Sequence, residues 1–422
     1  MRVLWLVNIP LPPVRARQGL PPLPYGGWLS STLSALVSEA PDLHVVCASR
    51  EWSDPVRFEC DGVEYVTVPR MRPEVGWHGV VSKWTGREER PALESEMRQL
   101  IADVQPDLVH LHGTEDPHAL AMLRAAGSVP LLVSVQGLVS ELVAGSNEGL
   151  SPADLFRDVA SVEFLKGRGF VQSRRRWKHV AARELETLAK ASDVSGRTDW
   201  DRDAVLRANP MARYWHIDEV LRQPFYQVTW RGPTDSVPTI IAVTGPSSNK
   251  GIDVLLRAFA RIRDRRDCRL RIVGQIEGTP LWPSLQRLEA QLGLTGEVDW
   301  AGERSATEVA AMLSMCSVAV CASRLENSSN SVCEAMLVGA PVVASRAGGI
   351  PSLLTHEEDG LLFEVGDDQA LAGAALAVLD DDHLARRLGA RARITASARH
   401  DPSSVAKRLL EVYAALVSGG RA

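Results

Sequence analysis

The feature that most constrains this chain is a repeated alternation of short apolar runs with longer amphipathic stretches. Apolar runs at 3–7, 44–47, 63–68, 108–111 and 131–135 have the length and composition of buried strands, and stretches of helical periodicity lie between several of them, as at 28–38 and 92–104. Strands that alternate with helices form a parallel sheet with helices on both faces. The first half of the chain is therefore predicted to be a doubly wound α/β domain.

The alternation starts again after a turn-rich, weakly apolar break at 232–238. Predicted strands follow at 239–243, 270–273, 298–300, 318–321 and 342–345, with predicted helices at 252–263, 284–292, 306–314 and 332–338. We therefore predict two Rossmann-like domains, residues 1–232 and 233–400, facing each other across a cleft, and a separate final helix within 401–422. Ligands of such sheets bind outside the carboxyl ends of the strands, so the cleft is the expected site.

Composition narrows the class of protein. The chain has 422 residues, a net charge of −5 and 45% hydrophobic residues, which is typical of a soluble globular protein and argues against a broad nucleic-acid-binding surface. Six cysteines without metal-binding spacing indicate free thiols in a reducing compartment. The apolar run near the N-terminus ends at Asn8, and the run at 370–379 is far shorter than the ~20 residues that span a bilayer. We expect no signal peptide and a cytoplasmic protein.

One stretch is unusually basic. Residues 166–183 contain seven Lys or Arg residues and no acidic residue, with Phe170 and Trp177 interleaved. Two interpretations stay open: a solvated helix face, or a patch that binds an anionic partner such as a pyrophosphate-lipid head group or an acidic leaflet, at ~1 kcal/mol per basic residue. The second would place the protein peripherally at the inner face of the membrane.

The most informative segment follows the predicted strand at 318–321. A polar loop there contains Glu326, and a helix is expected to begin near Ser331 with Glu334 in its first turn. The free N–H groups and positive dipole end of a helix start suit a diphosphate, and both carboxylates can face that pocket. The alternatives are a capping box formed by Ser331 and Glu334, and plain surface charge for Glu326.

A second loop, at 243–251, joins a predicted strand to a predicted helix. It contains Gly245 and Lys250 and is a candidate phosphate cradle, although Gly251 stands where a Walker A loop has Ser or Thr. A tight turn is the alternative.

In the first half, Gly26 and Gly27 form a comparable loop before a helix, and Arg197 lies at a strand end just before a plausible N-cap, Thr198. His110 and His112 share one face of a strand, but their spacing matches no standard zinc motif, so hydrogen-bonded histidines are favoured over a metal site.

Taken in order, these motifs resemble the retaining glycosyltransferases of family 4, which have the GT-B fold, and in particular members that build bacterial surface polysaccharides. The resemblance covers nearly the whole C-terminal half: residues 250–258, the pair Glu326 and Glu334 with seven residues between them, and the segments 339–345, 348–351 and 359–363. The N-terminal half matches at fewer places, namely 26–27, 107–112, 136–137 and 196–198.

The resemblance implies transfer of a sugar, with retention, from a nucleotide-diphosphate-sugar donor on the C-terminal domain to an acceptor hydroxyl. It implies that Lys250 neutralises the diphosphate, Glu326 holds sugar hydroxyls and Glu334 binds the ribose. It also implies that the backbone amides of the loop 327–331 bind the donor phosphates, and that the glycine pair lets the first loop approach these phosphates. The donor-binding positions are therefore Asn327, Ser328, Ser329, Asn330, Ser331, Gly26, Gly27 and Gly245. The implied acceptor is a sugar or lipid-linked oligosaccharide, and no cofactor or metal is expected. The resemblance also implies that the final helix, within 401–422, crosses back to the N-terminal domain.

The sequence departs from the family pattern at two places. The family commonly has an Arg shortly before the phosphate-loop Lys, and none stands between Gly245 and Lys250 here. Arg197 and Arg324 are candidates to supply that charge. Gln136 stands where many members have His, and an amide hydrogen-bonds a sugar hydroxyl but cannot carry a proton. An epimerase or phosphorylase of similar fold, or a catalytically silent sugar-nucleotide-binding subunit, therefore stays an alternative.

Overall fold

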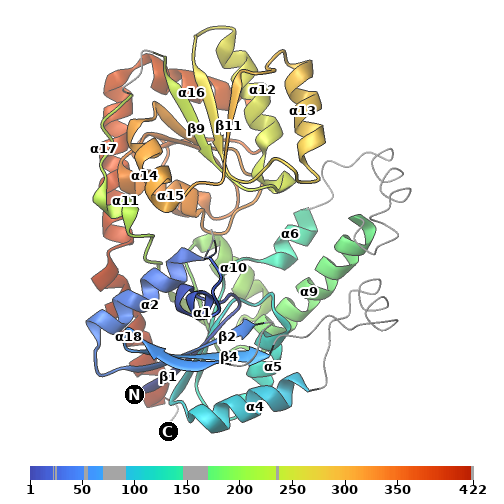
Figure 1. Ribbon diagram of the computed structural model, residues 1–422, viewed down its shortest axis with the longest axis vertical. Helices are drawn as coiled ribbons and strands as arrows, with labels where there is room; N and C mark the ends of the chain where they lie inside the picture. Colours follow the sequence, from blue (N-terminus) through green and yellow to red (C-terminus); the bar gives the residue numbers. More distant parts are fainter. Residues whose placement is uncertain are drawn as a thin grey trace.

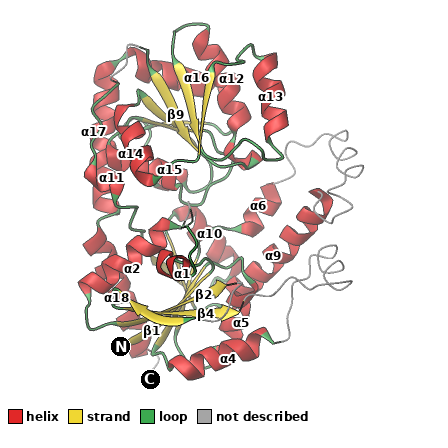
Figure 2. Cartoon of the chain, viewed as in Figure 1, coloured by secondary structure: helices red, strands yellow, loops and turns green. Residues whose placement is uncertain are grey.

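The computed structural model describes residues 1–21, 23, 26–51, 56–69, 92–145, 170–233 and 237–419. Two sheets, each lying between layers of helices, are stacked along the long axis of the molecule (Figure 1). The strands of each sheet run between helices that cover both faces, as the colouring by secondary structure makes clear (Figure 2). The predicted α/β class with two parallel-sheet domains is confirmed.

The N-terminal sheet has eight strands in the order β3-β4-β2-β1-β5-β6-β7-β8, all parallel except β3, which runs antiparallel to β4 at the edge. The strands are β1 (Arg2–Val7), β2 (His44–Glu51), β3 (Arg57–Cys60), β4 (Val63–Pro69), β5 (Leu108–His112), β6 (Leu131–Ser134), β7 (Asp193–Gly196) and β8 (Arg213–His216). The helices are α1 (Pro12–Arg17), α2 (Gly27–Glu39), α4 (Leu93–Val104), α5 (Pro117–Ala125), α6 (Val139–Gly145), α9 (Phe170–Lys190) and α10 (Asp199–Ala208).

The C-terminal sheet has six parallel strands in the order β11-β10-β9-β12-β13-β14. They are β9 (Thr239–Val243), β10 (Arg269–Val273), β11 (Val298–Gly302), β12 (Val318–Cys321), β13 (Val342–Ser345) and β14 (Leu361–Phe363). Around them lie α12 (Ile252–Arg263), α13 (Trp282–Gln291), α14 (Ala306–Met315), α15 (Asn330–Val338), α16 (Asp368–Asp380) and α17 (Asp382–Arg399).

The central strands follow from their apolar composition. All residues of β5, β12 and β13 are buried, because helices cover both faces of a parallel sheet. The sequence did not predict β3, β8 or β14, which lie at the sheet edges. Residues of β3 alternate between exposed and half-buried, and β8 has exposed ends around two half-buried residues. Short edge strands carry too weak a pattern to be recognised alone.

Two segments join the domains. The short helix α11 (Pro224–Gln227) packs on α14 and α15 of the C-terminal domain. The last helix, α18 (Pro402–Gly419), packs on α2, so the chain returns to the N-terminal domain (Figure 1). Leu409, Val412 and Leu416 of α18 are buried in the N-terminal core, and the Trp5 indole N–H donates to the Tyr413 hydroxyl at 2.8 Å.

The basic stretch 166–183 falls only partly within the described residues, since Lys166 and Arg168 lie outside them. The rest belongs to α9, where Arg175, Arg176 and Lys178 are exposed beside Trp177 and Arg183 is buried. Among the described residues, no helix combines the length and apolar character needed to cross a bilayer.

Candidate functional site

The carboxyl ends of the two sheets meet at the interface between the domains. Asn327, in the loop after β12, donates through its side-chain amide to the backbone oxygen of Gln136, which follows β6, at 3.2 Å. The Thr198 hydroxyl, after β7, donates to Asn327 at 3.3 Å. The expected site therefore lies where both sheets end, with Asn327 and Gln136 in direct contact.

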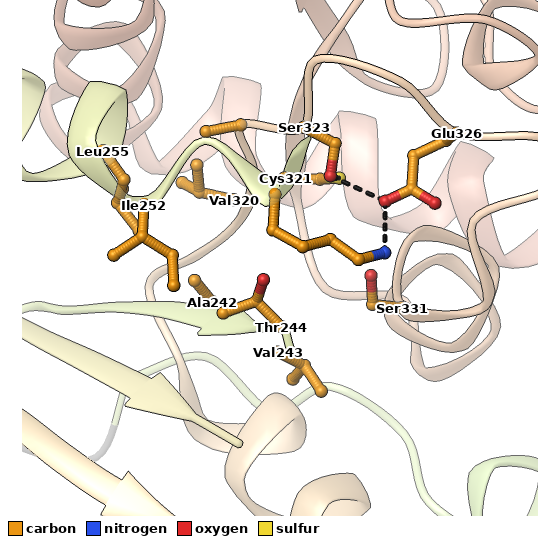
Figure 3. A pocket seen from close by; sticks show the side chains of 12 residues that line it. Ala242, Val243, Thr244, Ile252, Leu255, Val320, Cys321, Ser323, Glu326 and Ser331 are labelled. Carbon is orange, nitrogen blue, oxygen red and sulfur yellow. Dashed lines mark hydrogen bonds and ion pairs between the residues drawn. The ribbon is translucent and has the colours of Figure 1, made fainter. Parts of the chain in front are cut away.

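Lys250 and Glu326 form the centre of a pocket on the C-terminal domain. The Lys250 ammonium donates to Glu326 Oε1 at 2.6 Å, and the Ser323 hydroxyl donates to the same oxygen at 2.6 Å (Figure 3). The ends of β9 and β12 and the start of α15, including Ser331, line the rest of this pocket. Burial by itself lowers the pKa of Lys250, but the negative charge and hydrogen bond of Glu326 outweigh it, so the pKa is raised and the amine stays charged.

The turn that carries Lys250 sits directly against the end of β12. Gly251 has φ +64°, and a Cβ there would lie 1.9 Å from the backbone oxygen of Ala322. Only glycine permits this approach, which brings Lys250 within reach of Glu326. Gly245 lies earlier in the same loop, where a Cβ would meet no other atom within 4 Å.

The start of α15 also faces this pocket. The helix begins at Asn330 with Ser329 as its N-cap, and no side chain caps its first turn. Ser331 therefore lies inside the helix rather than at its N-cap and forms no capping box with Glu334, so that alternative is wrong. Uncapped N–H groups and the positive end of the helix dipole leave this helix start suited to a phosphate.

Glu334 is paired across the domain junction. Its two carboxylate oxygens accept from Arg222 Nε at 2.7 Å and from Arg222 Nη2 at 2.8 Å, and its side chain is 4% exposed. Burial raises the pKa of Glu334, and the Arg222 charge opposes that shift. Sequence reasoning missed Arg222, because no local pattern marks a residue in the connection between two domains.

The glycine pair of the first domain lies against the same arginine. A Cβ on Gly27 would be 2.9 Å from Arg222 Cγ and Cδ, and a Cβ on Gly26, which has φ +78°, would be 1.9 Å from Ile9 Cδ1. The positive φ favours glycine at position 26, and a side chain at position 27 would displace Arg222. Gly27 is thereby brought next to the Arg222–Glu334 pair.

Arg197 and Arg324 each form an ion pair with a carboxylate of the protein. Arg197 is buried, pairs with Glu219 and donates to the Gln136 backbone oxygen at 2.9 Å. Arg324 makes two hydrogen bonds of 2.8 Å to Asp253 and one of 2.9 Å to the backbone oxygen of Ser248, beside the Lys250 turn. Of the two, Arg324 is therefore the one that lies next to the predicted phosphate loop. Ser328, in the loop after β12, donates to Glu219 at 3.4 Å.

The histidines of β5 have no metal-site geometry. The two ring nitrogens of His110 lie 2.6 Å from the Tyr413 and Ser134 hydroxyls, so His110 is a hydrogen-bonded core histidine. Burial lowers the pKa of His110 to about 3. No group of three or more His, Cys, Asp or Glu side chains that would hold a metal occurs in the described ranges.

Two parallel-sheet domains that oppose their carboxyl ends define the class as GT-B-like. The crystal structure of Anabaena HepE in complex with UDP and glucose matches with a TM-score of 0.66 at 17% identity, over 98% of this chain and 99% of that one. At this identity the likeness shows the fold.

Sequence comparison then shows the family. Residues 237–381 match the family model described as glycosyl transferases group 1. The D-inositol 3-phosphate glycosyltransferase of Pseudarthrobacter chlorophenolicus is 33% identical over 82% of this chain and 81% of its own length. The chain belongs to the group 1 glycosyltransferases.

The match to another relative is confined to part of each chain. The N-acetyl-alpha-D-glucosaminyl L-malate synthase of Bacillus anthracis is 31% identical over 38% of this chain, and the matched stretch spans 41% of that relative's length.

Proposed function

We propose that this protein transfers a sugar, with retention, from a nucleoside-diphosphate sugar held by the C-terminal domain to a hydroxyl of an acceptor held by the N-terminal domain. The observation that carries the proposal is the Lys250–Glu326 ion pair in a pocket at the uncapped start of α15. This pocket opens where the carboxyl ends of both sheets meet.

The residues of the pocket suit the chemistry of a diphosphate leaving group. Lys250 and the N–H groups of α15 supply positive charge where negative charge develops as the sugar leaves, which is the main catalytic requirement of this reaction. Glu326 accepts hydrogen bonds and is placed to hold sugar hydroxyls. Because these groups already supply the positive charge, we propose that the protein acts without a metal ion or cofactor.

The acceptor and location are part of the same proposal. We propose a sugar or lipid-linked oligosaccharide acceptor in the synthesis of a cell-surface polysaccharide or glycolipid. Exposed Arg175, Arg176 and Lys178 beside Trp177 support peripheral contact with an anionic membrane surface. Six unpaired cysteines among the described residues support a reducing, cytoplasmic location.

The first experiment is a thermal-shift titration with UDP, GDP, ADP, dTDP and CMP, with and without EDTA. A nucleotide present at 100 times its Kd should stabilise the protein by about 2.7 kcal/mol. We expect one nucleoside diphosphate to raise Tm equally in both conditions. The sugar donor with that base is then tested for nucleotide release, and the anomeric configuration of the product is read by NMR.

Two variants locate the activity in this pocket. Lys250→Met should weaken nucleotide binding at least tenfold, whereas Glu326→Gln should lower turnover at least tenfold and change nucleotide affinity little. Lys407→Met and Glu411→Gln, on the exposed face of α18, are the matched controls. Absence of a shift with every nucleotide contradicts the proposal. If the donor sugar is epimerised when no acceptor is present, the protein is an epimerase instead. Turnover with a sugar 1-phosphate and no nucleotide donor would indicate a phosphorylase.

A further inference from the structure

Three polar side chains follow three neighbouring strands of the N-terminal sheet at their carboxyl ends. Asn8 comes directly after β1, Glu115 follows β5, and Gln136 follows β6. The Asn8 side-chain amide donates to Glu115 Oε1 and, at 3.2 Å, to Gln136 Oε1. We call these three residues the strand-end cluster.

The backbone is shaped to hold this cluster. Gly113 has φ +91°, and a Cβ there would lie 2.8 Å from Glu115 Oε2 and 2.9 Å from Asn8 Nδ2. The Glu115 carboxyl and the Asn8 amide therefore occupy the space that any other side chain at position 113 would fill.

Each member of the cluster has one buried polar atom without a hydrogen-bond partner in the described part of the chain. These atoms are Asn8 Oδ1, Glu115 Oε2 and Gln136 Nε2. The amide orientations follow from the contacts, since reversing Asn8 would set oxygen against oxygen and reversing Gln136 would set NH2 against NH2. Leaving a buried polar atom unpaired is unfavourable, so three in one cluster suit a ligand better than they suit folding.

The unpaired atoms also define what such a ligand offers. Two of them accept hydrogen bonds and one donates, which matches adjacent hydroxyl groups, since each hydroxyl both donates and accepts. In the described ranges no basic side chain forms an ion pair with Glu115. Burial, together with the nearby Glu184 charge, raises the pKa of the Glu115 carboxyl. An anionic group placed here would meet a carboxyl rather than a cation.

The strand-end cluster borders the loop after β12 that carries Glu326. The Gln136 backbone oxygen accepts from Asn327, the residue after Glu326. Resting on the glycosyltransferase function proposed above, we propose that Asn8, Glu115 and Gln136 bind adjacent hydroxyls of an uncharged ring polyol, a sugar or a cyclitol, as the reacting end of the acceptor.

The test is ligand-observed saturation-transfer NMR on the full chain, with the nucleoside diphosphate that raises its Tm present. The probes are methyl α-D-glucopyranoside, myo-inositol and, as the anionic comparison, L-malate. We expect transfer to at least one of the two neutral polyols and none to malate. Transfer to malate alone, or to neither polyol, overturns the proposal.

Glu115→Gln is the informative variant, because it keeps the shape and replaces the accepting Oε2 by a donor. We expect it to lower polyol affinity at least tenfold, to leave nucleotide affinity within twofold and not to lower Tm. Gln136→Leu should also lower polyol affinity, while exposed Glu411→Gln and Gln291→Leu should not.

Two further outcomes separate the inference from the function on which it rests. If Glu115→Gln lowers Tm and leaves polyol binding intact, the cluster is structural and the inference is wrong. If the wild-type protein binds no nucleotide, the proposed function is wrong. Nucleotide binding without polyol binding contradicts the inference alone.

Discussion

Both oxygens of the Glu334 carboxylate are bonded to Arg222, a residue 112 positions earlier in the chain. The local sequence around Glu334 allows either a capping box or a ligand-binding carboxylate. Neither interpretation includes an arginine partner. The sequence therefore marked Glu334 as a candidate functional residue, but it did not indicate that Arg222 is its partner.

Arg222 and Glu334 should be strongly coupled in stability. Removing one partner of a buried ion pair leaves the other unpaired, which costs about 3–5 kcal/mol. Because Arg222 is partly exposed, we expect Arg222→Met to lower the free energy of unfolding by about 3 kcal/mol, toward the low end of that range. The double variant Arg222→Met/Glu334→Leu should recover more than half of this loss in urea denaturation.

The same double variant also tests the ribose role that family resemblance implies for Glu334. If Glu334 meets the ribose, nucleotide affinity stays low in the double variant although its stability is recovered. Strictly additive losses of stability in the two single variants would mean that the pair is not coupled.

The start of α10 serves two purposes at the scale of an element. Thr198 and Asp201 form a capping box in which the Thr198 hydroxyl accepts from the Asp201 N–H at 3.2 Å. The same hydroxyl donates to Asn327 of the opposite domain. Thr198 was expected to be an N-cap from its position before two acidic residues, and the structure confirms the cap. No local pattern in the sequence predicted its contact with Asn327.

Thr198→Ala should therefore affect both stability and turnover. Loss of an N-cap costs about 1 kcal/mol, and loss of the Asn327 contact removes one restraint on the loop that carries Glu326. We expect this variant to lower the free energy of unfolding by about 1 kcal/mol and turnover severalfold. The matched control is Ser305→Ala, which removes the capping box of α14 on the C-terminal domain.

Ser305→Ala should lower stability by a similar amount and leave turnover unchanged. Urea denaturation and nucleotide release measure the two effects. An equal loss of turnover in both variants would show that it follows from stability alone.

At the scale of the whole molecule, α18 ties the end of the chain to its beginning. The Tyr413 hydroxyl accepts from Trp5 of β1 and lies 2.6 Å from His110 Nδ1 of β5. Three segments, each more than a hundred residues from the others in sequence, thus share one buried polar contact. A neutral His110 fits this contact, which agrees with the lowering of its pKa to about 3 by burial.

Burial of His110 makes stability sensitive to acid. The unfolded His110 imidazole binds a proton below its ordinary pKa of 6.5, whereas the folded one does so only near 3, so stability is full above pH 6.5 and falls as the pH drops toward 3. His110 alone should contribute a slope of about 1.4 kcal/mol per pH unit between pH 6 and 4. Burial also lowers the pKa of His112 and of His400, which steepens the total slope.

His110→Gln should reduce that slope, and the exposed His383→Gln should not. Urea denaturation at several pH values between 4 and 7 measures both. An unchanged slope in His110→Gln would show that His110 does not control the acid sensitivity.

Local sequence patterns predicted most of the elements and the loops that line the candidate pocket. Apolar periodicity and turn residues act over a few neighbouring positions, so the central strands of both sheets could be predicted, and the loops bearing Lys250, Glu326 and Ser331 lie together because parallel strands end at one edge. The weakly patterned edge strands β3, β8 and β14 escaped prediction.

Which side chains meet across long separations follows from the packing of the assembled fold. Arg222 with Glu334, Tyr413 with Trp5, and Asn8 with Glu115 and Gln136 are each joined by the packing of elements that are distant in sequence. Such contacts depend on the relative positions of sheets and helices, which no local pattern encodes. The physical reason is that propensity and hydrophobic periodicity are local properties, whereas partners for buried polar groups are set by the assembled fold.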